Sequence, residues 1–266
     1  MRVYISLMLA AVALLPSCAT VRSSRPTSDR ARRHDEAALR RRAEQLWNAK
    51  VAEDWATVFQ FQDPKLRQGF DEAQFAAWSE KEEPFEIHSF QIESAVTDGD
   101  LGWVRVPYRT SMRRFKGLEP RDAYHLQKWR RIDGQWYPIP NNEADEYPES
   151  PSQRDAAAER ELAARFAKSW EARRTADWAE LYRLSDPRDH ERVLSEEFAA
   201  VEGLIEYFDH KVYWVQVIGD VGKIRVMYYH KVNDPSMQNL TPQEKVKVER
   251  WVKFENEWYR DLIQEP

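Results

Sequence analysis

The feature that most constrains this chain is a stretch of sequence that occurs twice. The first copy, DWATVFQFQDP, covers residues 54–64, and the second, DWAELYRLSDP, covers residues 177–187. The two copies lie 123 residues apart (177 − 54 = 123). Because self-similarity at a long fixed spacing indicates a repeated structural unit, the chain is predicted to hold two tandem domains of similar fold.

The tryptophans show that the repeat extends far beyond this stretch. Four pairs recur at nearly the same offset, which changes only between elements, where loops tolerate insertions and deletions. The pairs are Trp47 with Trp170 and Trp55 with Trp178 (170 − 47 = 178 − 55 = 123), and Trp129 with Trp251 and Trp136 with Trp258 (251 − 129 = 258 − 136 = 122). They account for eight of the 11 tryptophans, so we interpret most tryptophans as scaffold shared by both domains.

The composition narrows the possible classes of function. With 266 residues, 42% of them hydrophobic, the chain can bury one large core or two modest ones. The net charge of −5 is too weak to indicate a nucleic-acid partner. The single cysteine, Cys18, excludes an intramolecular disulfide. Because the sequence contains no metal-ligand cluster, glycine-rich phosphate loop or nucleophile elbow, we predict no cofactor and no catalytic residue.

The N-terminus has the plan of a secretory signal peptide over residues 1–17. Arg2 supplies the positive charge, and residues 5–15 form an apolar run that is short for a membrane span. The ending Leu-Pro-Ser-Cys at Cys18 resembles the lipobox of bacterial lipoproteins, which implies a diacylglycerol on the Cys18 thiol and anchoring in the membrane. Ala19 after the cysteine implies, by the same resemblance, the outer membrane facing the periplasm. An ordinary signal peptide or an uncleaved anchor is the alternative.

The remaining chain reads as helices followed by strands, twice. Residues 18–34 are rich in Ser, Pro and Arg and predict a flexible tether. Helical spacing begins at residue 35 and, after the breaks at residues 54 and 63, gives way to strand-like alternation from residue 85. An acidic stretch over 141–154 predicts a linker between domain 1 (35–140) and domain 2 (155–266).

The predicted fold class is therefore α+β. Each domain is expected to pack three N-terminal helices on a curved antiparallel sheet, since large aromatic side chains need a sheet that curls around the helices. Asp54 and Asp177 are predicted helix N-caps, because a carboxylate accepts bonds from free N–H groups in the first turn. Asp63 and Asp186, each before a proline, are predicted to end the short helix.

These residues resemble the nuclear-transport-factor-2-like superfamily, whose fold is a cone of bent sheet and three helices. The resemblance is carried by Trp47, the Asp-Trp at 54–55, the Asp-Pro at 63–64, the Gly-Asp turn at 99–100, and the endings WRRIDGQWY (129–137) and WVKFENEWY (251–259). It implies the fold over most of the chain after residue 35. That superfamily includes isomerases, dehydratases, transport factors and plain binding modules, so the resemblance does not choose a function.

Four polar residues are candidates for ligand binding inside the cones. Tyr108 and its equivalent Tyr228 (228 − 108 = 120) fall in phase with the apolar strand face, and so, on our reading, do Lys128 and its equivalent Arg250 (250 − 128 = 122). A buried cation needs an anionic partner, which a ligand would supply. The alternatives are packed tyrosines with bonded hydroxyls, and cations that reach the cone mouth or pair with a helix carboxylate.

Arg105, Arg109 and Arg113 alternate along one predicted strand and make a basic sheet face that could bind an acidic partner. The partner could be another protein, the other domain or the acidic linker, and a simple solvated face is the alternative. The histidines have no spacing that demands a site.

Together the patterns predict a lipid-anchored envelope protein that acts as a non-catalytic binding or assembly module. Its expected partners are the membrane, through Cys18, and another envelope protein, and the duplication could let the chain form its own pseudo-dimer. The alternative function is a small-ligand carrier, or an isomerase- or dehydratase-like enzyme, that uses a cone cavity.

Overall fold

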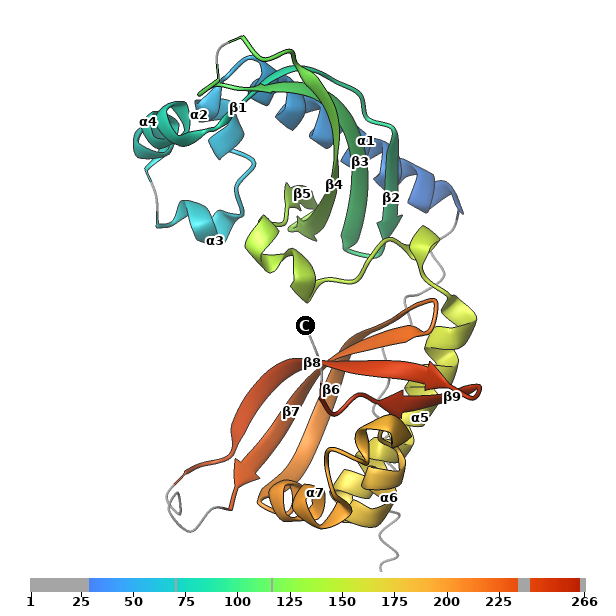
Figure 1. Cartoon of the computed structure of the whole chain (residues 1–266). Coiled ribbons are helices and arrows are strands. Elements are labelled where there is room, and N and C mark those ends of the chain that lie inside the picture. The colour runs from blue at the N-terminus through green and yellow to red at the C-terminus, as the bar shows by residue number, and fades with distance from the viewer. Residues whose placement is uncertain (1–28, 70, 116, 234–239, 264–266) are drawn as a thin grey trace, which may run out of the picture.

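The computed structural model describes residues 29–69, 71–115, 117–233 and 240–263. These residues form two α+β units in tandem, each with its helices packed on a curved antiparallel sheet (Figure 1), which confirms the predicted fold class. Two short 3-10 helices, η1 (Asn141–Glu146) and η2 (Pro151–Gln153), lie in the segment between the units.

The first unit places four helices before its strands. The helices are α1 (Asp29–Val51), α2 (Trp55–Phe59), α3 (Pro64–Arg67) and α4 (Glu72–Glu82). The strands are β1 (Phe85–Phe90), β2 (Ser94–Asp98), β3 (Leu101–Met112), β4 (Arg121–Ile132) and β5 (Gln135–Pro138). The sheet order is β1-β3-β4-β5, with β2 also paired to β3.

The second unit repeats this plan with fewer breaks. Its helices are α5 (Ala156–Arg174), α6 (Trp178–Arg183), the 3-10 helix η3 (Pro187–Asp189) and α7 (Ser195–Glu202). Its strands are β6 (Ile205–Ile218), β7 (Val221–Val232), β8 (Gln243–Phe254) and β9 (Glu257–Arg260), paired in that order.

The duplicated stretch folds around its two aspartates. Asp54 Oδ1 accepts a hydrogen bond from Thr57 N at 3.0 Å, and Asp177 Oδ1 accepts one from Glu180 N at 3.0 Å, which confirms the predicted N-caps. Asp63 follows the end of α2 but also caps the next turn, since its side chain accepts from Lys65 N. Asp186 does the same for η3. The Asp-Pro pair therefore starts a turn as well as ending one.

In each unit the long helix lies directly on the backbone of a central strand. Trp129 and Trp251 are both fully buried beneath these helices. A Cβ atom on Gly102 would come within 2.6 Å of Leu39 Cδ2, and one on Gly222 within 2.4 Å of Leu162 Cδ2. A larger residue at either glycine would force the facing leucine side chain to move.

Two elements differ from the sequence expectation. The described part of α1 begins at Asp29 rather than at residue 35, so the end of the expected tether is helical. The strand-like alternation that begins at residue 85 is divided into β1 and β2. Its counterpart β6 runs unbroken over 205–218 and absorbs its curvature in two register shifts.

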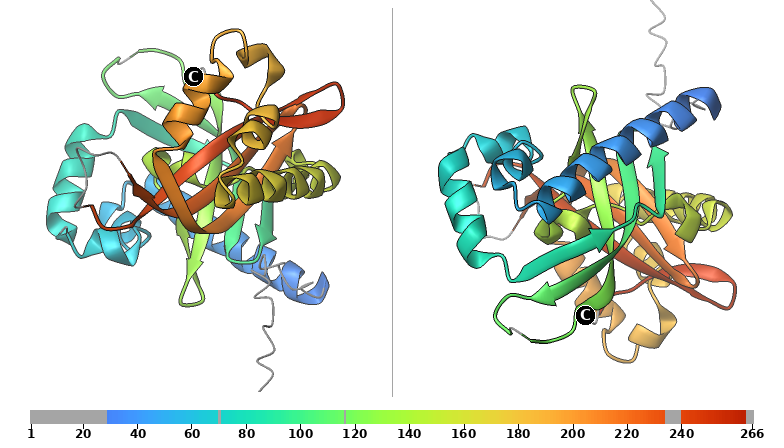
Figure 2. Two further views of the ribbon diagram at one scale, coloured as in Figure 1. Left: turned by 90° about the horizontal axis from the view of Figure 1, so that it is seen from below. Right: turned by 90° about the horizontal axis from the view of Figure 1, so that it is seen from above.

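The two sheets turn their outer faces toward each other with the linker between them. Viewed from above, α1 lies nearest the viewer, and viewed from below, α5, α6 and α7 do (Figure 2). The linker is hydrogen-bonded to both sheets. Trp103 Nε1 on β3 donates to Pro148 O at 3.0 Å, and Trp214 Nε1 on β6 donates to Glu146 O at 2.9 Å. The interior of each cone therefore lies on the far side of its sheet from the linker.

Candidate functional site

The cone of the first unit contains a cavity of about 410 Å³. Its walls come from α1, α2, the helix-facing side of β1, β3 and β4, and the segment after β5. The apolar lining is rich in aromatic rings and consists of Leu46, Trp47, Trp55, Val58, Pro84, Phe85, Ile87, Tyr108, Pro138, Ile139 and Pro140. Six polar side chains share the lining: Lys50, Gln62, Glu83, His125, Gln127 and Asn141. A concave wall that combines apolar rings with converging polar groups is typical of a small-molecule site.

Lys50 is the cation of this cavity. It lies in the last turn of α1, and its Nζ is 5.2 Å from the centroid of the Trp47 ring. This ammonium makes no hydrogen bond or ion pair with the described residues. Burial lowers the pKa of Lys50, and the Glu83 carboxylate at longer range opposes that shift in part. The charge thus lacks a direct protein partner.

Three further polar residues surround Trp47 in the same cavity. The ring of Tyr108 lies 5.1 Å and that of His125 6.4 Å from the Trp47 ring, between centroids. Gln127 Oε1 accepts a hydrogen bond from Trp47 Nε1 at 3.4 Å. Burial, together with the charge of Lys50, lowers the pKa of His125, which favours a neutral imidazole near pH 7.

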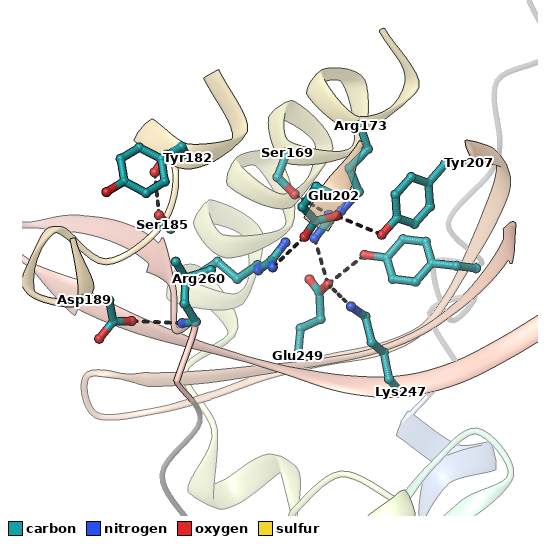
Figure 3. Close-up of polar contacts among 12 residues, drawn as sticks. Ser169, Arg173, Tyr182, Ser185, Asp189, Glu202, Tyr207, Lys247, Glu249 and Arg260 are labelled. Atoms are coloured by element: carbon teal, nitrogen blue, oxygen red, sulfur yellow. Dashed lines mark hydrogen bonds and ion pairs between the residues drawn. The ribbon is translucent and has the colours of Figure 1, made fainter. Parts of the chain in front are cut away.

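The cone of the second unit is filled by an ionic network instead. Arg173 occupies the place of Lys50 (173 − 50 = 123), and its side chain is 0% exposed. Its guanidinium donates to Ser169 Oγ at 3.0 Å and to Glu249 Oε1 at 2.9 Å. Glu249 also accepts a bond from the Tyr228 hydroxyl at 3.0 Å and pairs with Lys247 at 3.1 Å. Figure 3 shows these side chains converging from α5 and the sheet.

A second carboxylate extends the network toward α7. Glu202 pairs with Arg260 at 2.9 Å and accepts a bond from the Tyr207 hydroxyl at 3.1 Å (Figure 3). Burial alone would raise the pKa of Glu249, but the charges of Arg173, Lys247 and Arg260 outweigh it and lower the pKa to about 2. The pKa of Glu202 is also lowered, because Arg260 and Arg173 outweigh its burial. Both carboxylates are therefore ionised near neutral pH.

The equivalent positions explain the difference between the two interiors. Glu249 corresponds to Gln127 and Lys247 to His125 (249 − 127 = 247 − 125 = 122), and Glu202 corresponds to Ser79 (202 − 79 = 123). Each carboxylate of the second network is thus replaced by a neutral group in the first cone. The first cone keeps one cation and open space, whereas the second supplies its cations with carboxylates of its own.

The structure separates the four predicted ligand-binding residues. Tyr108 lines the cavity of the first cone, and Tyr228 lies in the network of the second. Lys128 and Arg250 were expected to point toward the helices with the apolar residues of their strands, and this prediction was wrong. The residues of β4 that face the helices are His125, Gln127 and Trp129, so Lys128 lies on the outer face. Whether any of the four binds a ligand stays a prediction.

Lys128 instead holds the linker. Its Nζ donates to Ala144 O at 3.0 Å, Tyr147 O at 2.9 Å and Glu149 Oε1 at 2.8 Å. Arg250, its equivalent on β8, pairs with Asp261 at 2.6 Å. Both cations therefore have partners from their own chain.

The predicted partner-binding arginines do not form one surface. Arg105 pairs with Glu93 at 2.8 Å, and Arg109 is exposed on the same outer face of β3. Arg113 lies beyond the end of β3 and pairs with Glu53 at 2.7 Å. The acidic linker pairs with other cations, Glu149 with Lys128 and Glu146 with Arg225 at 2.6 Å. Partner binding by the three arginines stays a prediction.

Sequence reasoning missed the residues that distinguish the cones. Lys50 and Arg173 each lie three residues after a paired tryptophan, Trp47 and Trp170. Comparing the two copies position by position, with attention to polar residues rather than aromatic ones, could have found them.

Other kinds of site find no support among the described residues. No group of three or more His, Cys, Asp or Glu side chains there could hold a metal ion. In that same part of the chain, no helix is long and apolar enough to cross a membrane. The predicted lipid attachment site, Cys18, lies outside the described residues.

No protein-family model and no curated protein matches the chain. Similar solved structures include a SEC-C motif containing protein from Rhodopseudomonas palustris, which is 20% identical with a TM-score of 0.28 over 35% of this chain and 69% of that one. A protein from Campylobacter jejuni described as an NTF2-like transpeptidase is 15% identical, with a TM-score of 0.28 over 36% of this chain and 94% of that one.

A third similar structure, an Ntf2-like protein involved in plasmid conjugation, is 8% identical, with a TM-score of 0.26 over 82% of this chain and 94% of that one. These scores are too low to carry an argument about function. The fold described above rests on the order and pairing of the chain's own elements.

Proposed function

We propose that this protein is a binding module whose first cone encloses a small organic molecule with an apolar body and an anionic end. The second cone is its structural copy. The observation that carries this proposal is the unpaired Lys50 ammonium inside an aromatic cavity of about 410 Å³.

The physical reason is that a half-buried ammonium is only partly hydrated, so an anionic partner in the cavity is favourable. A carboxylate or sulfonate brought by a ligand would supply the missing ion pair with Lys50, while Trp47 and Trp55 would bury its apolar body. In the second cone Glu249 already forms the corresponding ion pair with Arg173. That cone thus models the interaction that a ligand would make in the first.

Binding is favoured over proton-transfer catalysis by what the cavity lacks. His125 has no hydrogen-bonded acid to orient it among the described residues. The carboxylate of Glu83 lines the cavity, but its Oε1 accepts a hydrogen bond from Phe85 N at 3.3 Å. An enzyme of the isomerase or dehydratase kind needs a positioned acid–base pair, which these contacts do not provide.

Anilinonaphthalene sulfonate, an aromatic anion that fluoresces in apolar sites, tests the proposal. We expect the full chain to bind it and Lys50→Met to weaken binding by at least about tenfold, or 1.4 kcal/mol. Lys81→Met makes the same chemical change at an exposed lysine and should leave binding unchanged. Trp78→Ser removes an exposed ring at a separate apolar hollow formed by α2, α3 and α4. Equal affinity of Lys50→Met and the wild type, or loss of binding only in Trp78→Ser, would overturn the proposal.

We further propose that the module is tethered to the cell envelope through Cys18 and meets another envelope protein there. The support is the sequence pattern of residues 1–18. Labelling of cells with radioactive palmitate should mark the wild type and not Cys18→Ala, which should leave the membrane fraction. An unlabelled wild type would contradict anchoring. Crosslinking in intact cells should then capture a partner in a manner that depends on Cys18.

The facing sheets support the further proposal that the chain forms its own pseudo-dimer in solution (Figure 2). Small-angle scattering should fit one compact monomer, whereas two separated bodies on a flexible linker would contradict it.

A further inference from the structure

We infer that Lys50 forms a reversible imine with a small apolar aldehyde held in the cavity of the first cone. The inference rests on the proposed function in using the same cavity, and it adds a covalent activity to that binding site.

The first support is the accessibility of the amine to a ligand. Lys50 lines the cavity, and the described residues offer its Nζ no hydrogen bond or ion pair. Three of the other buried or half-buried lysines are held by acceptors of the chain, and Lys231, which has no such partner among the described residues, does not line this cavity. Lys128 donates to three oxygens, Lys247 pairs with Glu249, and Lys253 pairs with Glu161. An amine that reacts must have its lone pair free, and Lys50 is the lysine of this cavity whose nitrogen is not engaged.

The second support is the environment of the amine. Lys50 Nζ lies over the Trp47 ring, and Tyr108 and His125 lie around the same ring. Burial lowers the pKa of Lys50, so a larger fraction is neutral amine near pH 7 than for an exposed lysine. The apolar wall would bury the hydrocarbon part of an aldehyde and hold its carbonyl near the nitrogen.

The reaction balances without an oxidant or reductant. The lone pair of Nζ attacks the carbonyl carbon and forms the C–N bond, while the carbonyl oxygen takes up a proton. The carbinolamine then loses its hydroxyl as water, so that amine and aldehyde give imine and water. Imine formation needs one proton carrier rather than the positioned acid–base pair of an isomerase, and His125, which lines the same cavity with a lowered pKa, can take the proton from nitrogen and return it to the departing hydroxyl.

The second cone provides an internal comparison. Arg173 stands at the position of Lys50, but its guanidinium is fully buried and bonded to Ser169 and Glu249. A guanidinium stays protonated at any ordinary pH and is no nucleophile. The inferred activity therefore belongs to the first copy alone.

Reductive trapping tests the inference on the full chain. The protein is incubated with naphthaldehyde and sodium cyanoborohydride near neutral pH, and the hydride of that reagent converts an imine to a stable secondary amine. Intact mass and peptide mapping should show one dominant adduct on Lys50, labelled at least about tenfold faster than any other lysine, because the cavity holds the aldehyde near its nitrogen. Anilinonaphthalene sulfonate should protect Lys50 by competition. Labelling spread over surface lysines, or no labelling of Lys50, would overturn the inference.

Two variants separate this inference from the proposed function. Lys50→Arg should abolish the adduct and still bind anilinonaphthalene sulfonate, because the guanidinium keeps the charge without the nucleophile. His125→Gln should slow trapping several-fold more than it weakens binding of that anion, which is measured on the same variant. If the wild type binds the anion but gives no Lys50 adduct, the imine is excluded and the binding function stands. If it gives the adduct but Lys50→Met binds the anion as well as the wild type does, the anion-binding function fails instead.

Discussion

The two cones of this protein share a scaffold and differ in what fills it. Both place a long helix on a central strand at a glycine, and both surround a buried tryptophan with the same arrangement of strands. In the second cone the space beneath the helix holds Arg173 with Glu249. In the first the corresponding space is a cavity that contains Lys50. The backbone and the aromatic residues therefore set the shape of each cone, and a few polar positions decide whether its interior is open.

The difference also separates stability from binding. A network that satisfies its own charges stabilises one arrangement of side chains and leaves no group for a ligand. A cation without a partner leaves the domain less stable but able to gain an ion pair on binding. On this view, duplication supplied one copy that can be rigid and another that can remain open. Three experiments test this contrast between the two cones.

The largest expected effect comes from removing the cation of each cone. Arg173→Met should destabilise the second domain by about 3 kcal/mol, because the buried Glu249 loses its fully buried cation and keeps only Lys247 and the Tyr228 hydroxyl. Lys50→Met should leave the first domain unchanged or more stable, because the removed charge had no partner. Hydrogen exchange in increasing urea, read separately on peptides of each domain, measures both.

The double variant Arg173→Met with Glu249→Leu is the control for that pair. It removes both charges and should recover most of the lost stability. If Lys50→Met destabilises its domain as strongly as Arg173→Met does, the proposed contrast between the cones is wrong.

A smaller effect is expected in acid. The pKa of Glu249 is about 2 in the folded chain against an ordinary value of 4.5. A lowered folded pKa contributes stability that is present above the unfolded value and lost as pH falls toward the folded one. The second domain should therefore lose about 3 kcal/mol between pH 4.5 and pH 2.

Glu249→Gln should flatten this dependence, since no carboxylate titrates at that position. The measurement is the slope of the unfolding free energy with pH, followed on peptides from β8. A slope that is the same in the variant and the wild type would show that other carboxylates carry the acid response.

The smallest effect is expected from giving the first cone a carboxylate. Gln127→Glu places an acid where the second cone has Glu249, and it should pair with Lys50. The affinity for anilinonaphthalene sulfonate should fall about tenfold, because the ligand must now compete with an internal anion. Gln68→Glu, an exposed position, is the matched control. Unchanged affinity in Gln127→Glu would mean that Lys50 does not hold the anionic end.

Much of the fold could be predicted from the sequence because large aromatic residues and helix caps are local signals. The tryptophan pairs and the capping aspartates Asp54 and Asp177 are read without knowing the tertiary structure. The break between β1 and β2 was not predicted, because apolar residues alternate across it in the sequence, whereas in the structure the inward-facing positions shift from Phe90 in β1 to Ala95 in β2.

The site was harder to predict because burial depends on what covers each face. Leu126 is apolar and lies in phase with Lys128 on β4, yet it is 50% exposed on the outer face. His125 and Gln127 do face the helices, but their polar side chains alone would place them on the protein surface. Lys50 gave no local signal, since a lysine in the last turn of a helix is commonly solvated and favoured there by the helix dipole.

The length of helix α1 separates its N-terminal end from the cavity of the first cone. Its described part has 23 residues, which at 1.5 Å per residue makes a rod about 35 Å long. Lys50 lies one residue from its C-terminal end, and the chain enters the helix from the opposite end. If Cys18 is held at a bilayer and α1 points away from it, the mouth of the cavity lies at least the length of this rod from the lipid surface. The binding site would then sample molecules in the aqueous space rather than those dissolved in the membrane.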